Sequence, residues 1–215
     1  MIKPTPCIPD RHRRLLLATP LLLLPGALAA QQRRPTPRMT LGPFYPDVLP
    51  AERDADLTVV AGQPGRAAGT LLYVTGRVTD IRGKPLPKAR LEFWQANGKG
   101  RYIHSADTDA SGPLDPNFQG YGALVADAEG RYRIKTVKPA PYSGRTPHIH
   151  AIATAGGTRL VTQMFFEGEK LNGRDGVFRA LDRDGQRAAT GTWVERTAPM
   201  EPDALAVAWD IVLEN

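Results

Sequence analysis

The stretch HIHAIATAGGTRLVTQMFF, residues 148–166, decides the fold. Two runs rich in apolar and β-branched residues flank a tight, glycine-containing connection at residues 155–157, and such a pattern is typical of a β-hairpin. Because successive side chains of a strand point to opposite faces, His148 and His150 are predicted to project from the same face. The stretch therefore predicts a hairpin that carries two imidazoles side by side.

Similar short runs, separated by turn signals, occur on both sides of this stretch. We predict strands at residues 71–78, 89–96, 131–137, 148–154, 159–166 and 206–213. Only residues 172–187 lack the pattern, and this segment is predicted to hold at most a short helix. Several short strands at roughly ten-residue spacing favour an all-β fold, an antiparallel β-sandwich or barrel with long loops.

The first 29 residues have the pattern of an export signal. Arginines precede a leucine-rich run at residues 15–24, and small residues with an Ala27-x-Ala29 cleavage pattern follow it. The apolar run is too short to span a bilayer, so no permanent membrane span is expected. The pair Arg13-Arg14 also resembles a twin-arginine signal, and both export routes stay open. We expect cleavage near Ala29/Ala30 and a periplasmic or secreted mature protein.

The net charge of +6 and the one cysteine describe the whole chain of 215 residues. Residues 1–29 carry four basic residues, one acidic residue and Cys7, which leaves 24 basic and 21 acidic residues and no cysteine in the mature chain. Near-neutral charge argues against a nucleic-acid partner, and the missing thiols exclude a disulfide framework and a cysteine zinc site. We expect residues 30–68 to form an N-terminal arm and residues 69–215 the β-sandwich catalytic domain.

The mature chain has three histidines, His104, His148 and His150. Two adjacent imidazoles on one face of a strand are a natural pair of metal ligands. Because cysteine is absent and few carboxylates lie near them in the sequence, any further ligands must be oxygen atoms from elsewhere in the chain. The spacing of the histidines alone does not identify those atoms.

Several separate blocks of the chain resemble the intradiol ring-cleavage dioxygenases. They follow one another in the family's order over most of residues 41–213: GPFYP at 42–46, LEFWQAN at 91–97, GRY at 100–102, LDPNF at 114–118, GYG at 120–122, KPAPY at 138–142, RTPHIH at 145–150 and TQMFFEG at 162–168. The fold expected from pattern and resemblance together is an antiparallel β-sandwich of the prealbumin, or transthyretin, type.

The resemblance implies a metal site. In that family two tyrosinates and two histidines hold a mononuclear Fe(III), and by motif position these are Tyr102, Tyr142, His148 and His150, with one ion per chain. A tyrosine has a pKa near 10, so it binds a metal at neutral pH only if a strongly Lewis-acidic ion displaces its proton. The resemblance further implies that a catechol displaces Tyr142 and that O₂ cleaves the ring between its hydroxyl-bearing carbons, giving a cis,cis-muconate-type product.

The resemblance also implies catalytic roles beyond the ligands. Arg145 matches an arginine that favours negative charge on the substrate, and Gln163 matches a glutamine that orients Arg145 or the ring. With Tyr142, these are the expected catalytic residues. Phe165 stands where protocatechuate-cleaving relatives tend to carry a tyrosine, so the substrate stays open among catechol, protocatechuate, hydroxyquinol and larger lignin-derived diols. We expect an oligomer, with a homo-oligomer as one option.

Two alternatives to a complete enzyme stay open. Residues 74–78 and 83–90 have a pattern common to transthyretin-like sandwiches, which is compatible with a carrier or adhesion module without catalysis. A non-catalytic partner subunit of a two-subunit dioxygenase would share the fold but lack the ligands. The full set of two tyrosines and two histidines favours the enzyme over both alternatives.

Overall fold

The computed structural model describes Met1, residues 32–108 and residues 113–214. The export signal predicted over residues 1–29 lies outside the described residues, apart from Met1, and its cleavage stays a prediction. Within the part of the chain that is described, no helix is long and apolar enough to cross a bilayer.

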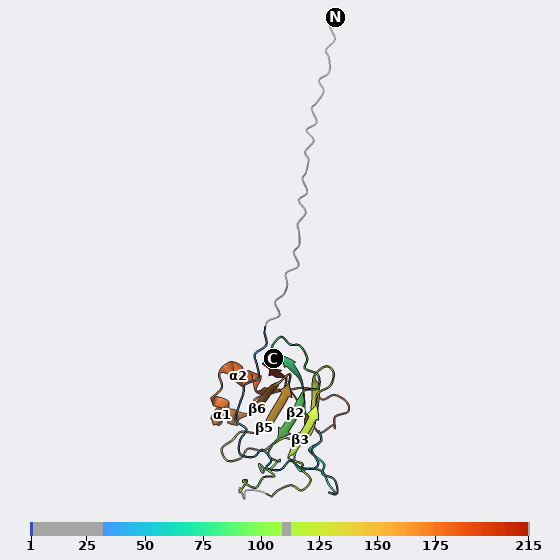
Figure 1. The fold of residues 1–215 in the computed structure, drawn as a ribbon, viewed down its shortest axis with the longest axis vertical. Helices are drawn as coiled ribbons and strands as arrows, with labels where there is room; N and C mark the ends of the chain where they lie inside the picture. Colours follow the sequence, from blue (N-terminus) through green and yellow to red (C-terminus); the bar gives the residue numbers. More distant parts are fainter. Residues whose placement is uncertain (2–31, 109–112, 215) are drawn as a thin grey trace. The chain divides into compact units, whose positions relative to one another are not determined.

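The described residues form nine strands joined in one sheet with the order β3-β2-β5-β6-β7-β8-β1-β4, and β9 pairs with β1. Figure 1 shows β3, β2, β5 and β6 side by side. The strands are β1 (Leu71–Asp80), β2 (Arg90–Trp94), β3 (Tyr121–Val125), β4 (Arg131–Val137), β5 (His148–Ala155), β6 (Thr158–Phe166), β7 (Thr190–Trp193), β8 (Leu205–Ala208) and β9 (Ile211–Leu213). The expectation of an all-β fold is confirmed, and the predicted hairpin is the antiparallel pair β5–β6.

The expectation of a purely antiparallel sheet is wrong. Strand β7 runs parallel to β6, and both β8 and β9 run parallel to β1. Parallel neighbours need a long crossover connection, which residues 167–189 supply between β6 and β7. The predicted last strand at 206–213 is two strands, and the short strands β3 and β7 were not predicted.

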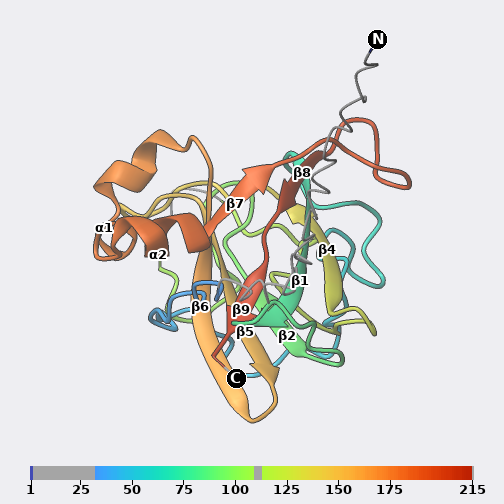
Figure 2. The same cartoon turned by 90° about the horizontal axis from the view of Figure 1, so that it is seen from above.

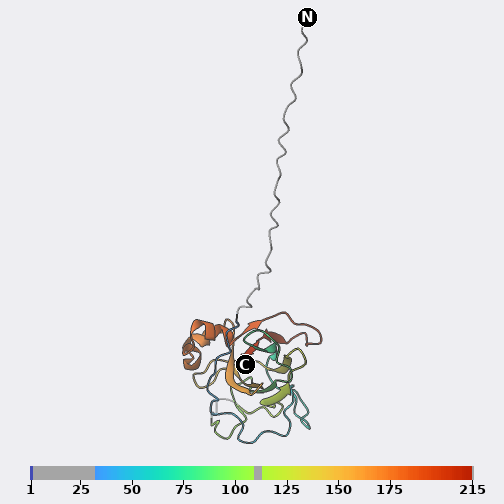
Figure 3. The same ribbon diagram turned by 45° about the horizontal axis from the view of Figure 1, so that its top comes forward.

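The crossover contains the only helices of the described chain. One short helix was expected at about residues 172–187, and the structure has three short elements there: a 3₁₀ helix (Lys170–Arg174), α1 (Gly176–Arg179) and α2 (Arg183–Ala188). Asp175 and Asp182 precede α1 and α2. The Asp175 carboxylate accepts hydrogen bonds from the N–H groups of Val177 and Phe178, and the Asp182 carboxylate accepts one from the N–H of Gly185. Both helices lie beside β6 (Figures 2 and 3).

Strand β5 separates the hydrophobic core from a second, aromatic region. Ile149 and Ala151 on one face belong to a core that β1, β2, β4, β6, β8 and β9 share. His148 and His150 point to the other face, and both are 1% exposed. Strand β5 is therefore buried on both faces, between β2 and β6, which holds its backbone firmly.

The N-terminal arm connects the two edge strands of the sheet. The carbonyl of Arg53 accepts a hydrogen bond from the N–H of Ala123 in β3. Leu57 donates its N–H to the carbonyl of Lys135 in β4. A side chain at Gly122 in β3 would place its Cβ 2.5 Å from a backbone oxygen of the arm, so only glycine permits this approach. The arm thus covers both edges that would otherwise be open.

Candidate metal centre

The four predicted ligands meet on the aromatic face of β5. The ring nitrogens His148 Nε2 and His150 Nε2 lie 3.1 Å apart. Tyr142 Oη lies 3.4 Å from His148 Nε2 and 3.4 Å from Tyr102 Oη. Because bonds from a metal to its ligands are about 2 Å long, neighbouring ligand atoms around one ion lie about 3 Å apart. Each donor atom therefore has at least one neighbour at the separation expected for ligands that share one ion.

Hydrogen bonding fixes the ring of His148. Its Nδ1 lies 2.7 Å from the carbonyl oxygen of Thr146, which can only accept, so Nδ1 carries the proton. The lone pair of Nε2 is then free and points into the cluster. His150 has a buried Nδ1 without a hydrogen-bond partner among the described residues, and Trp94 stacks on its ring at 4.7 Å. Both rings thus present Nε2 to the same point.

Tyr142 stands on a tight turn. Its carbonyl accepts a hydrogen bond of 2.6 Å from the N–H of Arg145, and the two residues between them have positive φ angles, 40° at Ser143 and 77° at Gly144. This geometry is that of a two-residue turn with both central residues in the left-handed region. The turn places the phenol of Tyr142 and the guanidinium of Arg145 beside one another.

Tyr102 lies in a loop that side chains hold in place. The carboxylate of Asp107 accepts a hydrogen bond of 2.6 Å from the Tyr102 N–H. The ring of Phe44, from the N-terminal arm, stacks on Tyr102 at 4.5 Å. His104 accepts a hydrogen bond at Nδ1 and contacts the Tyr45 carbonyl through Nε2, so it ties the arm to this loop and has no place among the four donors.

Burial keeps all four donors in their neutral forms without a cation. Burial raises the pKa of Tyr102 well above its usual value, and neighbouring Tyr142 raises it further. Burial also raises the pKa of Tyr142. For the imidazoles burial has the opposite effect: it lowers the pKa of His148 to about 4 and lowers that of His150 as well. Neutral imidazoles are ready to bind a metal, whereas the phenols ionise only if a strong Lewis acid replaces their protons.

Arg145 and Gln163 contact each other next to the donors. The Arg145 Nη2 donates to Gln163 Oε1 at 2.6 Å, and the Gln163 amide donates to the carbonyl of Thr40 at 3.1 Å. Both the oxygen and the nitrogen of the Gln163 side-chain amide therefore make a hydrogen bond. Gln163 lies opposite His150 in the β5–β6 register, which explains why it reaches this face.

Asp175 is a residue of the site that the sequence did not reveal. Its carboxylate is fully buried and accepts a hydrogen bond of 2.8 Å from Arg145 Nε. The same carboxylate accepts from the N–H groups of Thr146, Val177 and Phe178. Asp175 therefore joins the start of α1 to the arginine beside the metal centre. Its sequence signal, an aspartate before a helix, predicts only a helix cap.

Aromatic rings line the remaining sides of the centre. Phe165 is fully buried, with its ring 6.0 Å from that of His148 and 4.9 Å from that of Phe178. Its place in the register is opposite His148, and no hydroxyl group is present there. In the chain as described, no group of three or more His, Cys, Asp or Glu side chains is arranged so that it could hold a metal ion.

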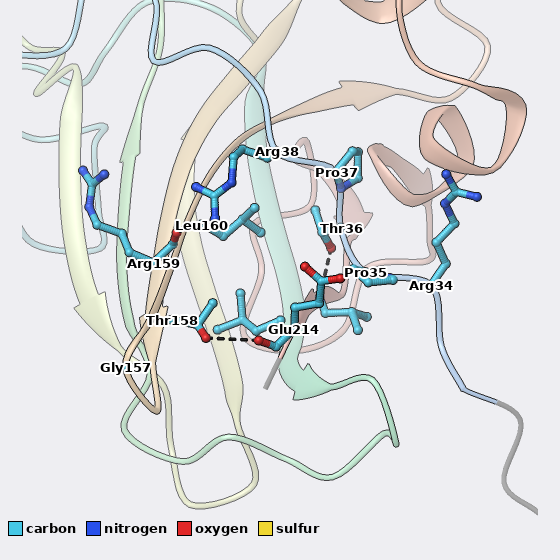
Figure 4. Close-up of a pocket in the computed structure, with 12 residues that line it drawn as sticks. Arg34, Pro35, Thr36, Pro37, Arg38, Gly157, Thr158, Arg159, Leu160 and Glu214 are labelled. Carbon is cyan, nitrogen blue, oxygen red and sulfur yellow. Dashed lines mark hydrogen bonds between the residues drawn. The ribbon is translucent and has the colours of Figure 1, made fainter.

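A pocket of about 400 Å³ opens beside Tyr142. We call it the Tyr142 pocket; it is lined by residues 141–145, Leu171 and Arg174. A larger hollow of about 750 Å³ lies between the N-terminal arm and the turn of the β5–β6 hairpin (Figure 4). His148 lies at the opposite, open end of that hairpin, so the larger hollow is remote from the donors.

Comparisons with known proteins agree with this geometry. Residues 40–215 match the family model described as Dioxygenase. The protocatechuate 3,4-dioxygenase beta chain of Burkholderia cepacia is 40% identical over 171 residues, which are 75% of this chain and 72% of that protein. The hydroxyquinol 1,2-dioxygenase of Nocardioides simplex is 31% identical over 201 residues, 83% of this chain and 64% of that protein.

Solved structures share the fold. The dioxygenase domain of a dioxygenase carbohydrate-binding protein fusion from Streptomyces sp. SirexAA-E is 30% identical, with a TM-score of 0.63, and the match covers 84% of this chain and 99% of that one. Catechol 1,2-dioxygenase from Acinetobacter sp. ADP1 is 28% identical, with a TM-score of 0.62, over 83% of this chain and 62% of that one. With the family model matching well over half of its residues, the chain belongs to the intradiol ring-cleavage dioxygenase family.

Proposed function

We propose that the protein cleaves a catechol-type aromatic ring between its two hydroxyl-bearing carbons with O₂ at a mononuclear Fe(III), one ion per chain, and releases a cis,cis-muconate-type product. The observation that carries the proposal is the row of two phenol oxygens and two imidazole nitrogens, Tyr102, Tyr142, His148 and His150, in which each atom lies 3.1–3.4 Å from the next. A carrier or adhesion module has no need of such a set, and the relatives found are named as dioxygenases.

The donor set fits ferric iron. The proposed ligands are Tyr102 Oη, Tyr142 Oη, His148 Nε2 and His150 Nε2. Two phenolates are hard anionic donors, which match a small trivalent cation better than a soft or divalent one. When bound, such an ion would supply the Lewis acidity that favours the deprotonated diol and makes the ring reactive toward O₂.

Tyr142 is the residue placed to receive a proton from the diol. It lines the pocket and is partly exposed, whereas Tyr102 is 3% exposed. A phenolate at Tyr142 Oη accepts one diol proton as the substrate enters, and burial favours the neutral phenol that results. Tyr102 keeps its place because Phe44 and Asp107 hold it.

Arg145 stabilises the negative charge that the deprotonated diol brings to the site. Asp175 and Gln163 each hold one nitrogen of its guanidinium, so its orientation is set before the substrate arrives. Fixed donors near developing charge lower the barrier because they need no reorganisation during the reaction. The rings of Trp94 and Phe165 exclude water from the histidine side of the site.

The visible spectrum tests the iron assignment. Purified protein loaded with ferric iron should show a tyrosinate-to-iron charge-transfer band, which anaerobic catechol should shift, and aerobic catechol should yield the muconate. Tyr142→Phe should weaken the band and slow turnover. The matched control is Tyr121→Phe, because the Tyr121 hydroxyl donates to Glu92 and is not one of the four donors. A colourless protein that retains one equivalent of iron would contradict the ligand assignment.

We further propose the type of β-sandwich, the division of the chain into segments, and its export from the cytoplasm. The arrangement of both sheet halves around one core supports a prealbumin-type sandwich. The arginine, leucine and alanine pattern supports removal of residues 1–29, an arm at 30–68, a catalytic domain at 69–215, and a periplasmic or secreted location. N-terminal sequencing of the exported protein should give a sequence that begins near Ala30.

The relative named as a beta chain supports an oligomeric enzyme, and sedimentation of the purified protein tests the oligomeric state directly.

A further inference from the structure

Asn172 is a buried amide near the metal centre that takes no part in the proposed chemistry. It lies in the 3₁₀ helix of the crossover and is 8% exposed. Its Nδ2 donates a hydrogen bond of 2.9 Å to the carbonyl of Phe166, the last residue of β6. Its Oδ1 accepts a hydrogen bond of 2.9 Å from the hydroxyl group of Thr146. One amide therefore joins the end of β6 to the segment that leads into β5.

The partners of Asn172 fix the direction of both hydrogen bonds. A backbone carbonyl can only accept, so the NH₂ group of Asn172 must face Phe166 and its oxygen must face Thr146. Because that oxygen also can only accept, the Thr146 hydroxyl group is the donor. An ionised aspartate has no N–H group and could not bind the Phe166 carbonyl. The position therefore requires a side chain that both donates and accepts.

Thr146 makes three hydrogen bonds at once. Its N–H donates to the buried Asp175 carboxylate at 3.0 Å, and its hydroxyl group donates to Asn172. Its carbonyl accepts the bond of 2.7 Å from His148 Nδ1. Pro147 follows Thr146, and a residue before proline is confined to extended backbone conformations, which narrows the directions that this carbonyl can take. The two bonds from Thr146 to the crossover thus hold the carbonyl that orients His148.

The two side chains that hold Thr146 come from one side of the 3₁₀ helix. Asn172 lies within this helix, and Asp175 follows its last residue. They are three residues apart, and a 3₁₀ helix has three residues per turn, so both side chains project in the same direction. Asp175 also binds Arg145, so one helical turn supports both the arginine and the histidine side of the metal centre.

We infer that Asn172 is a positioning residue of the metal centre, which acts through Thr146 to keep the lone pair of His148 aimed at the metal. The inference rests on the proposed function, because it takes His148 as a ligand. If the Thr146 carbonyl moves away from Nδ1, the imidazole proton can lie on Nε2 instead. There it faces His150 and must be removed before a metal can bind.

The test uses substitutions that remove the bond between Asn172 and Thr146 from either side. Thr146→Val is nearly isosteric and lacks the hydroxyl group, Thr146→Ser keeps it, and Asn172→Ala removes the amide. The matched control is Thr136→Val, because Thr136 is fully buried in β4 and its hydroxyl group donates to the side-chain oxygen of Gln95 at 3.0 Å. The control loses the same kind of bond, but within the described chain the side chain of Gln95 bonds only to Thr136 and to backbone carbonyls.

Two measurements report on the metal centre without turnover. In the metal-free protein, ¹⁵N NMR of the histidine side chains shows which nitrogen of His148 carries the proton. Competition with a chelator gives the affinity of each variant for ferric iron. Urea unfolding measures the loss of stability separately, so that a purely structural effect is recognised.

The wild-type protein should carry the His148 proton on Nδ1. Thr146→Val and Asn172→Ala should place part of it on Nε2 and should weaken ferric iron binding about ten- to a hundredfold, the usual effect of losing the partner that orients a histidine ligand. The double variant should bind iron within about twofold of Asn172→Ala, because both changes remove the same bond. Thr146→Ser should keep most of the affinity. Thr136→Val should lose stability but keep the proton position and the iron affinity.

Three results would overturn the inference: a wild-type His148 proton on Nε2, unchanged iron affinity in Thr146→Val and Asn172→Ala, or an equal loss of affinity in Thr136→Val. If Asn172→Ala does not fold, Thr146→Val and Thr146→Ser decide the question, and equal iron affinities of these two variants refute the role of Asn172.

The same measurements separate this inference from the proposed function. If the wild-type protein binds ferric iron but cleaves no diol, the proposed function fails, and the iron affinities of the variants still decide the role of Asn172. If it cleaves catechol and the variants bind iron as tightly as wild type does, the proposed function stands and the role of Asn172 is refuted. If the wild-type protein binds no ferric iron, both proposals fail together.

Discussion

Replacing Asp175 with alanine tests whether one buried carboxylate supports both the arginine of the site and the helix beside it. The carboxylate accepts hydrogen bonds of 2.8 Å from Arg145 Nε and 3.0 Å from the N–H of Thr146. It also accepts bonds of 2.9 Å from the Val177 N–H and 3.0 Å from the Phe178 N–H. Asp175→Ala removes the only acceptor for these donors and leaves the guanidinium beside a small cavity.

The expected loss of stability follows from burial. Removing one partner of a buried ion pair costs about 3–5 kcal/mol, and Arg145 keeps 20% of its side chain exposed, so the lower part of this range applies. A loss of about 3 kcal/mol in the free energy of unfolding lowers Tm by about 6–12 °C in a domain of this size. Activity should fall as well, because Arg145 then keeps only its bond to Gln163.

Urea unfolding of Asp175→Ala and Asp182→Ala separates the two contributions. Asp182 caps α2 as Asp175 caps α1, but its carboxylate is exposed and pairs with Arg34 on the surface. The control therefore loses a helix cap without uncovering a buried charge, and its stability should fall much less. Equal losses in the two variants, or unchanged kcat/KM in Asp175→Ala, would refute the role assigned to Asp175.

The effect of Asp175 should also depend on pH. Burial disfavours the charged form, but the N–H of Phe178, the Arg145 guanidinium and the N–H of Thr146 outweigh burial and hold the pKa of Asp175 below its usual value of 3.8. The unfolded chain then binds a proton more readily than the folded one. The stabilisation is full above the unfolded pKa and is lost as pH falls through the folded pKa. The stability difference between wild type and Asp175→Ala should therefore shrink in acid, which urea titrations at several pH values measure.

Three further substitutions probe how closely the site is packed. Gly100→Ala places a Cβ 2.7 Å from the Pro141 carbonyl oxygen and 3.4 Å from Tyr142 Cβ, so it should weaken the ferric charge-transfer band. Gly144→Ala is the control, because Gly144 also has a positive φ but a Cβ there would meet nothing within 4 Å. This control should lose only about 1–2 kcal/mol of stability, from backbone strain. Phe165→Tyr puts a hydroxyl group into a fully buried aromatic contact, so it should lower the free energy of unfolding by about 1–3 kcal/mol, as measured by urea unfolding. A variant more stable than wild type would show that the hydroxyl group finds a hydrogen-bond partner there.

Local sequence pattern predicted the elements with strong periodicity and missed those without it. The hairpin at 148–166 was predicted to within a residue, because two long apolar runs surround a glycine turn. Strand β3 contains a glycine and has only five residues, and β7 has four, so neither has a clear period. The parallel pairing of β7 with β6 depends on how the crossover returns to the sheet, which no local pattern encodes.

The residues of the candidate site likewise fall into those that local sequence pattern predicts and those that it does not. Strand alternation alone predicted that His148 and His150 share a face, and the structure places their Nε2 atoms 3.1 Å apart. Tyr102 and Tyr142 lie in loops, where no period applies, so only the resemblance to a family pointed to them. Asp175 is 30 residues from Arg145, and their contact requires the 3₁₀ helix to fold back on the turn after Tyr142.

The four proposed donors differ in how firmly the chain holds them, and we propose that this difference decides which one yields to a substrate. His148 and His150 stand on a strand paired on both sides and buried on both faces. Tyr102 is held by the Asp107 carboxylate and the stacked Phe44 ring. Tyr142 stands on a two-residue turn whose backbone bonds go only to the residue that closes it, and its phenol borders a pocket. Displacing Tyr142 breaks no strand pairing and removes only its contacts with the aromatic cluster around Tyr102. We therefore propose that it is the donor that leaves while the other three keep their geometry.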